Sequence, residues 1–148
     1  MSAPWSHISL VGVGLLGGSI GLAARQRGLA ARVTGFVRRA PAVAECEQTG
    51  AVDKADTDLW RAVEGADLVI LCTPIAQMAG LMTKMLPALK KGTIVTDVGS
   101  VKGSVVPTSN RWPRRVACIS SAHIRWRARR RWASVRRARI SSSARCAW

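Results

Sequence analysis

The sequence predicts an α/β fold in which helices cover both faces of a doubly wound, mostly parallel sheet. Three observations support this class. Short apolar runs rich in β-branched residues alternate with stretches of helical periodicity, glycine or proline ends most of these segments, and the first apolar run leads directly into a glycine-rich turn. The 148 residues are enough for one domain with a substantial core.

The first half of the expected domain alternates strands and helices. The apolar run HISLVGVG, residues 7–14, is typical of a buried parallel strand that ends in glycine. A helix is expected over residues 20–27, and a second strand, RVTGFV, over residues 32–37. The segment AVAECEQTG then predicts a helix that ends at Gly50, with a short strand after it.

The second half continues the alternation. DLWRAVEGA, residues 58–66, predicts a helix with Gly65 at its C-terminal cap, and DLVILCTP, residues 67–74, predicts an apolar strand that stops at a proline. Residues 75–89 predict an amphipathic helix, and the KKG turn leads to a strand over residues 93–97. Three methionines of the amphipathic helix are expected to fill the core: Met78, Met82 and Met85.

The glycine-rich turn matches a dinucleotide-binding motif in its expected context. Gly12-Val13-Gly14-Leu15-Leu16-Gly17 reads G-x-G-x-x-G between a predicted strand and a predicted helix. In this motif the first glycine allows a tight turn, the second lets the backbone approach a pyrophosphate, and the third allows the helix to pack closely on the strand. The helix N-terminus then offers free N–H groups to the phosphates. We therefore expect a Rossmann-type domain, with a purely structural glycine-rich turn as the alternative.

Two arginines stand where this class of site selects between NAD and NADP. An NAD-specific site usually carries Asp or Glu at the end of the second strand to hold the ribose 2′-hydroxyl. Here the corresponding residues are Arg38 and Arg39, whose guanidinium groups can bind a 2′-phosphate. The sequence therefore favours NADP over NAD, and a solvated basic loop is the alternative.

Three segments are expected to converge on one crevice, because ligands of such sheets bind beyond the carboxyl ends of the strands. The glycine motif follows the first strand, and residues 97–102 follow the last predicted strand. Cys72, Thr73 and Pro74 end the apolar strand between them. These three residues join the glycine motif as candidate cofactor contacts.

Three stretches of the sequence resemble the nucleotide-binding domain of the prephenate and arogenate dehydrogenases of tyrosine biosynthesis: VGVGLLGGSIGLAAR, GADLVILCTPIAQM and GTIVTDVGSVKGSVV. The resemblance runs from about His7 to Val106. It implies an enzyme that oxidatively decarboxylates prephenate or arogenate, a small-molecule substrate, with NAD or NADP. It also implies that Thr73 lies against the cofactor and that Ser100 faces the ring hydroxyl of the substrate. For Ser100, a plain turn residue after Gly99 is the alternative.

The catalytic base that the resemblance implies, a histidine in a motif resembling H-P-M-A-G, is missing from this reading frame. His123 is followed instead by Ile-Arg-Trp-Arg-Ala. Synonymous codons exist, however, for which the frame one nucleotide upstream reads V-Y-I-V-G-A and then H-P-M-A-G-S-E-K-M-G. We therefore interpret the residues from about Pro107 onward as an out-of-frame product. The helical C-terminal dimerisation domain of the family is then expected to be absent, so we expect little turnover and no homodimer.

The composition divides the chain at the same place. Residues 1–106 contain eleven Lys or Arg and eight Asp or Glu. Residues 107–148 contain twelve Arg, no Lys, no acidic residue, no Leu and four of the six Trp, as GC-rich codons read out of register would give. We expect a nucleotide-binding domain over residues 1–106 and a tail without stable order over residues 107–148. The alternatives are an arginine-rich arm that binds RNA or DNA, or a cofactor-sensing module without catalysis.

The sequence favours a cytoplasmic protein. Its start lacks the basic region and cleavage site of a signal peptide, and no apolar run reaches the length of a membrane span. The cysteines match no metal or redox spacing, so we expect inert thiols and no metal site. They are Cys46, Cys72, Cys118 and Cys146. We expect no membrane partner, and nucleic acid bound at most non-specifically through the tail.

Overall fold

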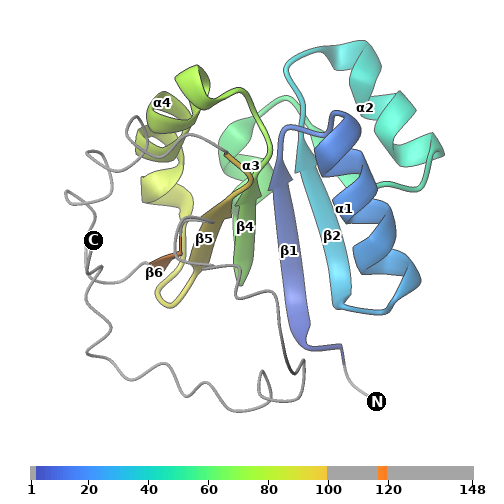
Figure 1. Cartoon of the computed structure of the whole chain (residues 1–148), viewed down its shortest axis with the longest axis horizontal. Coiled ribbons are helices and arrows are strands. Elements are labelled where there is room, and N and C mark those ends of the chain that lie inside the picture. The colour runs from blue at the N-terminus through green and yellow to red at the C-terminus, as the bar shows by residue number, and fades with distance from the viewer. Residues whose placement is uncertain (1–2, 100–116, 120–148) are drawn as a thin grey trace, which may run out of the picture.

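The computed structural model describes residues 3–99 and 117–119, and these residues confirm the predicted α/β class. One sheet has the strand order β3-β2-β1-β4-β5-β6, and every neighbouring pair is parallel (Figure 1). The order reverses between β1 and β4, which is the position where this class of sheet binds ligands. The strands are β1 (Trp5–Val11), β2 (Ala30–Phe36), β3 (Lys54–Asp56), β4 (Leu68–Leu71), β5 (Ile94–Asp97) and β6 (Ala117–Ile119).

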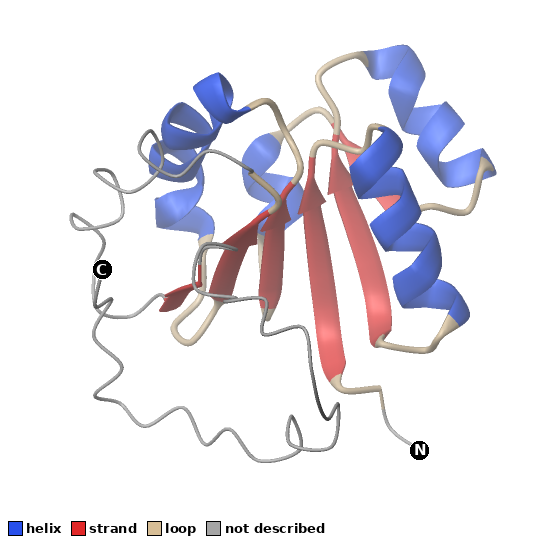
Figure 2. Ribbon diagram, viewed as in Figure 1, coloured by secondary structure: helices blue, strands red, loops and turns tan. Residues whose placement is uncertain are grey.

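The helices of the described residues lie on both faces of the sheet. Figure 2 shows α1 in front of the strands and α3 behind them. On one face, helix residues Ala24 and Cys46 pack with Leu10 of β1. On the opposite face, Val63 and Met82 pack with Val69 of β4. The helices are α1 (Leu15–Gln26), α2 (Ala40–Gln48), α3 (Leu59–Val63), α4 (Ile75–Met85) and the 3-10 helix η1 (Leu86–Ala88). The three methionines of α4 are buried, as predicted.

Two helices show the largest differences from their predicted bounds. Helix α1 begins at Leu15 rather than at residue 20, so Gly17 lies in its first turn. Glycine disfavours helix in isolation, but the close packing of Gly17 on the preceding loop decides the conformation here. Helix α4 ends at Met85, before the predicted end at residue 89, and continues as η1. Pro87 explains this change, because proline has no N–H to donate inside an α-helix.

Strand β6 lies in the segment that was expected to have no stable order. It pairs in parallel with β5, and Ala117, Cys118 and Ile119 lie opposite Ile94, Val95 and Thr96. This pairing adds a sixth strand to the sheet beyond the predicted boundary at residue 106. For these three residues the expectation was wrong, because an unsatisfied strand edge can recruit a short apolar segment whatever its flanking composition. The rest of the segment 107–148 lies outside the described residues.

A buried polar network lies beneath the carboxyl-terminal half of α3. The Thr34 hydroxyl donates to the carbonyl oxygen of Ala62 at 2.7 Å, and Ser9 Oγ donates to the same oxygen at 2.7 Å. His7 Nε2 lies 2.8 Å from Thr34 Oγ1. Because the single Thr34 hydroxyl proton is already donated, His7 must donate from Nε2 in this contact. Every member of the network is buried, and its hydrogen bonds satisfy these polar atoms inside the core.

We expect the protein to lose stability as the pH falls below about 6.5. Burial and the nearby positive charge of Arg32 lower the pKa of His7 below its ordinary value of 6.5. Below that value the unfolded chain takes up a proton that the folded chain resists, so the free energy of unfolding falls until the pH reaches the lowered folded pKa. Unfolding midpoints measured across this range should show the loss, and a His7→Gln variant should show a flatter profile. An equal slope in both proteins would contradict the assignment to His7.

Candidate dinucleotide-binding site

The glycine motif forms the turn between β1 and α1 at the reversal point of the sheet. Gly12 has φ +97°, a left-handed conformation that glycine adopts without a steric penalty. Its N–H donates to the Phe36 carbonyl at 3.0 Å, which ties the turn to β2. On the other side, the Cys72 N–H donates to the Val11 carbonyl at 2.9 Å. The turn is therefore held between the carboxyl ends of β2 and β4.

The three motif glycines are required for different reasons. A Cβ on Gly12 would lie 2.7 Å from Thr73 Cγ2, and a Cβ on Gly17 would overlap the carbonyl oxygen of Gly12. These two glycines therefore allow close packing inside the protein. Gly14 differs, because a Cβ there would meet nothing within 4 Å and would project into open space. Its missing side chain leaves room for an external group, as the motif predicts for a pyrophosphate.

The N-terminus of α1 has the chemistry of an anion site. Gly14 is its N-cap residue, so no side chain caps the first N–H groups, and no acidic residue occurs in the first turn. The uncapped N–H groups and the positive end of the helix dipole favour a negatively charged group here. The described residues of this turn therefore fit the diphosphate of a dinucleotide.

A crevice of about 520 Å³ opens beside this helix terminus. It brings together all three segments that the sequence placed there: the glycine motif, the end of β4 and the residues after β5. The lining residues are Gly14, Leu15, Leu16, Cys72, Thr73, Pro74, Ile75, Met78, Val98 and Gly99. The lining is mostly apolar, with few polar side chains, as is usual for cofactor pockets.

Several predicted residues occupy positions different from the crevice lining. Val13 turns away from it, since its side chain lies where a Cβ on Gly35 would be and packs against the core under α1 and α2. Arg38 and Arg39 follow Val37 after the end of β2 and are exposed, with Arg39 as the N-cap residue of α2. Ser100 lies outside the described residues. Its role stays a prediction.

Sequence reasoning missed two apolar residues of the crevice. Ile75 and Met78 project from the first turn of α4, and Met78 is both a core residue and part of the lining. Helical periodicity indicates which face of α4 is buried, but it does not reveal that the buried face ends at a ligand cavity. The position of Pro74 as N-cap directly after Thr73 is the signal that could have extended the site into α4.

Cys72 lines the crevice as a neutral thiol. Burial raises its pKa to about 11. A thiol with such a pKa is almost entirely protonated near neutral pH and is a poor nucleophile. Cys72 therefore serves as apolar lining. In residues 3–99 and 117–119, no group of three or more His, Cys, Asp or Glu side chains could hold a metal ion, and no helix there is long and apolar enough to cross a membrane.

The Thr73 hydroxyl is the one buried side-chain oxygen or nitrogen without a hydrogen-bond partner in the described part of the chain. Leaving such a group unsatisfied costs on the order of 1–3 kcal/mol. In a native structure, a buried polar group without a partner calls for an explanation, such as a functional role or an ordered water. Thr73 is part of the crevice wall, although its hydroxyl oxygen itself is buried.

A Thr73→Val variant should separate the two roles of this residue. Valine keeps the shape and removes the orphaned hydroxyl, so we expect unchanged or higher stability. Cofactor affinity should fall about threefold to tenfold, the value of one ordinary hydrogen bond. Thermal unfolding and dinucleotide titration of both proteins would measure this. Loss of stability with unchanged affinity would show that the hydroxyl serves the fold instead.

The reversal point, the uncapped helix terminus and the crevice together define a dinucleotide-binding domain of the doubly wound class. A family model described as "Prephenate dehydrogenase, nucleotide-binding domain" matches residues 20–124. The chain therefore belongs to the prephenate dehydrogenase family. The matched segment continues past Val106, where the sequence motifs predicted its end, and includes β6.

Individual relatives agree with this family. The chain is 35% identical over 104 residues to cyclohexadienyl dehydrogenase from Zymomonas mobilis, a match that covers 70% of the chain and 36% of the relative. It is 29% identical over 104 residues to prephenate dehydrogenase from Lactococcus lactis, covering 70% of the chain and 29% of the relative. The chain thus spans about a third of the length of these curated relatives.

Solved structures show the same fold. Arogenate dehydrogenase from Synechocystis superimposes with a TM-score of 0.67 at 34% identity, covering 72% of this chain and 37% of that one. Prephenate dehydrogenase from A. aeolicus, crystallised with hydroxyphenyl propionate and NAD+, gives a TM-score of 0.68 at 26% identity, covering 76% and 40%. These comparisons give no support to the nucleic-acid-binding alternative.

Proposed function

We propose that this chain carries the cofactor-binding part of a prephenate or arogenate dehydrogenase, which oxidatively decarboxylates its substrate with NAD or NADP. The observation that carries the proposal is the crevice itself. It joins an uncapped helix N-terminus, the open space beside Gly14 and the orphaned Thr73 hydroxyl at the reversal point of the sheet. The named relatives, which are prephenate, arogenate and cyclohexadienyl dehydrogenases, support the substrate class.

Each part of the crevice has a distinct task in this proposal. The first turn of α1 would hold the diphosphate through backbone N–H groups, and Gly14 would let it approach. A bound nicotinamide would supply the hydride acceptor. The apolar side chains of Leu16, Ile75 and Met78 would exclude water from the reacting groups. Within this proposal, Ser100 remains the candidate for contacting the substrate hydroxyl.

We infer that the cofactor is NADP rather than NAD. Arg38 and Arg39 are exposed in the short connection between β2 and α2, and no carboxylate occurs in that connection. In the described part of the chain, neither guanidinium forms an ion pair. Both are therefore available to a 2′-phosphate, which arginine binds in a bidentate manner.

Replacing Arg38 by alanine should weaken NADP binding by about tenfold or more, because a charge-assisted hydrogen bond is worth about 1.5–3 kcal/mol. NAD affinity should change little, since NAD has no 2′-phosphate. Parallel fluorescence titrations with NADPH and NADH would measure both affinities. Arg27→Ala, an exposed arginine at the end of α1, is the matched control. The inference on NADP fails if NAD binds as tightly as NADP to the parent chain, or if Arg38→Ala leaves NADP binding unchanged.

We also propose that the segment from about residue 107 is read out of frame. In the alternative frame, the residues V-Y-I coincide with β6, and H-P-M-A-G follows three residues later. A strand at this position supports the proposal, because β6 runs parallel to β5 and their carboxyl ends meet at the same edge of the sheet.

A further inference from the structure

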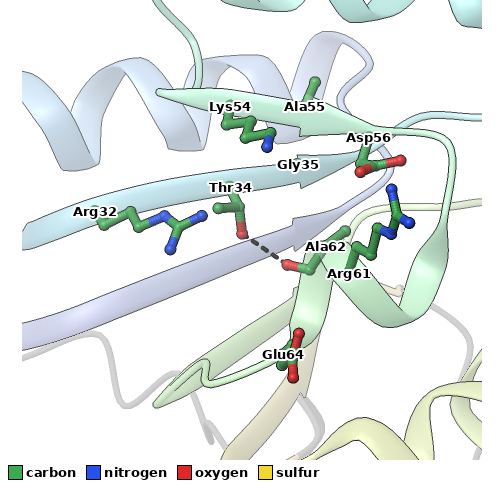
Figure 3. A pocket seen from close by; sticks show the side chains of 9 residues that line it. All are labelled: Arg32, Thr34, Gly35, Lys54, Ala55, Asp56, Arg61, Ala62 and Glu64. Carbon is green, nitrogen blue, oxygen red and sulfur yellow. Dashed lines mark hydrogen bonds between the residues drawn. The ribbon is translucent and has the colours of Figure 1, made fainter.

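A second hollow, of about 370 Å³, lies between β2, β3 and α3 (Figure 3). It shares no lining residue with the dinucleotide crevice. Thr34 and Ala62 line its inner wall, where they take part in the buried hydrogen-bond network. Five charged residues surround it: Arg32, Lys54, Asp56, Arg61 and Glu64.

Strand register places two of these cations on the same face of neighbouring strands. Lys54 of β3 lies opposite Thr34 of β2, so the two side chains project from the same face of the sheet. Arg32 precedes Thr34 by two residues and therefore projects from that face as well. In Figure 3 the guanidinium of Arg32 and the ammonium of Lys54 both point into the hollow. The arrangement brings two positive charges to one wall.

Neither cation has an acidic partner in the described part of the chain. The ion pairs formed there are Arg25–Asp53, Arg61–Asp58 and Lys90–Asp67. Like charges on neighbouring strands repel each other. A bound anion would relieve this repulsion and use the donors of both groups.

The remaining charges limit what can bind. The Asp56 carboxylate accepts from the Asp58 N–H at 2.8 Å and stands at the far rim beside Arg61, while Glu64 stands at the lower rim in Figure 3. These two carboxylates would repel an extended polyanion such as nucleic acid. They leave room at the Arg32 and Lys54 wall for one small anionic group.

We propose that this hollow is a second ligand site, which binds a small molecule bearing a phosphate or carboxylate group through Arg32 and Lys54. The site is separate from the dinucleotide crevice and does not depend on its function. The buried hydrogen-bond network beneath α3 connects this hollow to His7, whose pKa can be measured. His7 contacts Thr34 directly, and the charge of Arg32 contributes to the lowered pKa of His7. An anion beside Arg32 offsets that charge and so raises the pKa of His7.

The test is an NMR titration of the full chain, with inorganic phosphate and with acetate as separate probes. The backbone amide signals of Arg32 and Lys54 should shift and saturate with at least one probe, and saturation should raise the pKa of the His7 imidazole. In the double variant Arg32→Gln/Lys54→Gln, the dissociation constant of the saturating probe should rise by about tenfold or more, since two charge-assisted contacts are removed. Arg27→Gln is the control. Arg27 is an exposed residue at the end of α1, on the opposite face of the sheet, and its replacement should leave that dissociation constant unchanged.

The residue-specific readout separates this hollow from other phosphate contacts, such as the glycine motif or the arginines of residues 107–148. Saturation by phosphate alone assigns the ligand to phosphate compounds, and saturation by both probes assigns it to oxyanions in general. Shifts that rise linearly without saturation, or equal saturation in the double variant, would overturn the proposal. A correctly folded double variant is confirmed by an unchanged amide spectrum outside β2, β3 and α3.

Discussion

A Gly14→Val variant is expected to fold normally and to lose a hundredfold or more of its dinucleotide affinity. The backbone of Gly14, with φ −93° and ψ −155°, is open to any residue, and a Cβ there meets no protein atom within 4 Å. The valine side chain would instead occupy the space beside the first turn of α1. Losing two charge-assisted phosphate contacts of about 1.5–3 kcal/mol each accounts for the expected loss.

Gly17→Ala is the informative counterpart, because it should lower the stability of the fold rather than act on the cofactor directly. Its new Cβ would overlap the carbonyl oxygen of Gly12, so α1 and the preceding turn would have to move apart. Such overpacking costs typically 1–3 kcal/mol. Gly18→Ala serves as the control in the same helix. A Cβ on Gly18 meets nothing within 4 Å, and alanine should stabilise the helix by roughly 0.5–1 kcal/mol.

Thermal unfolding and NADPH titration of these three variants would test the assignment. The expected pattern is lost binding with normal stability for Gly14→Val, and lowered stability for Gly17→Ala. If Gly14→Val bound NADPH as tightly as the parent chain, the diphosphate would have to lie elsewhere. The proposed cofactor site would then be wrong.

The sequence made the crevice predictable because each of its three segments directly follows a strand with a clear apolar pattern. Residues 14–16, Thr73 and Gly99 therefore meet as expected once the sheet is parallel and the strand order reverses between β1 and β4, whereas Val13 turns away from the crevice. Local sequence patterns could not assign Ile75 and Met78 to the crevice lining, since their place in it depends on how α4 packs beside the crevice. Long-range geometry, and not residue pattern, decides such contacts.

The second hollow shows the same limit more clearly. RVTGFV is recognisable as a strand, but only the register of β2 against β3 brings Arg32 and Lys54 to one wall. They are 22 positions apart in the sequence, and no motif links them. Strand β6 escaped prediction for a related reason. Its three residues become a strand through pairing with β5, and their composition carries little signal of its own.

Restoring the alternative reading frame should raise prephenate-dependent NADPH formation by about a hundredfold to ten-thousandfold over the chain as printed, the usual contribution of a positioned general base. The change is one nucleotide inserted between the codons of Val106 and Ala117, with translation continued to the stop codon of that frame. The encoded V-Y-I would occupy the position of β6. The histidine of H-P-M-A-G would then follow the carboxyl edge of the sheet, where β5 ends at Asp97 and Gly99 lines the crevice.

Both proteins should be assayed side by side with prephenate and with arogenate, and with NADP and NAD. Their affinity for NADPH should be similar, because the insertion leaves Gly14, Thr73 and Arg38 unchanged, and this serves as the internal control. Replacing the histidine of the restored motif by glutamine should return the rate close to that of the printed chain. Comparable rates from the printed and restored chains would require a different base and would disprove the out-of-frame interpretation. Resequencing the gene across the codons for residues 105–117 tests it independently, since an uninterrupted frame in independent isolates would contradict it as well.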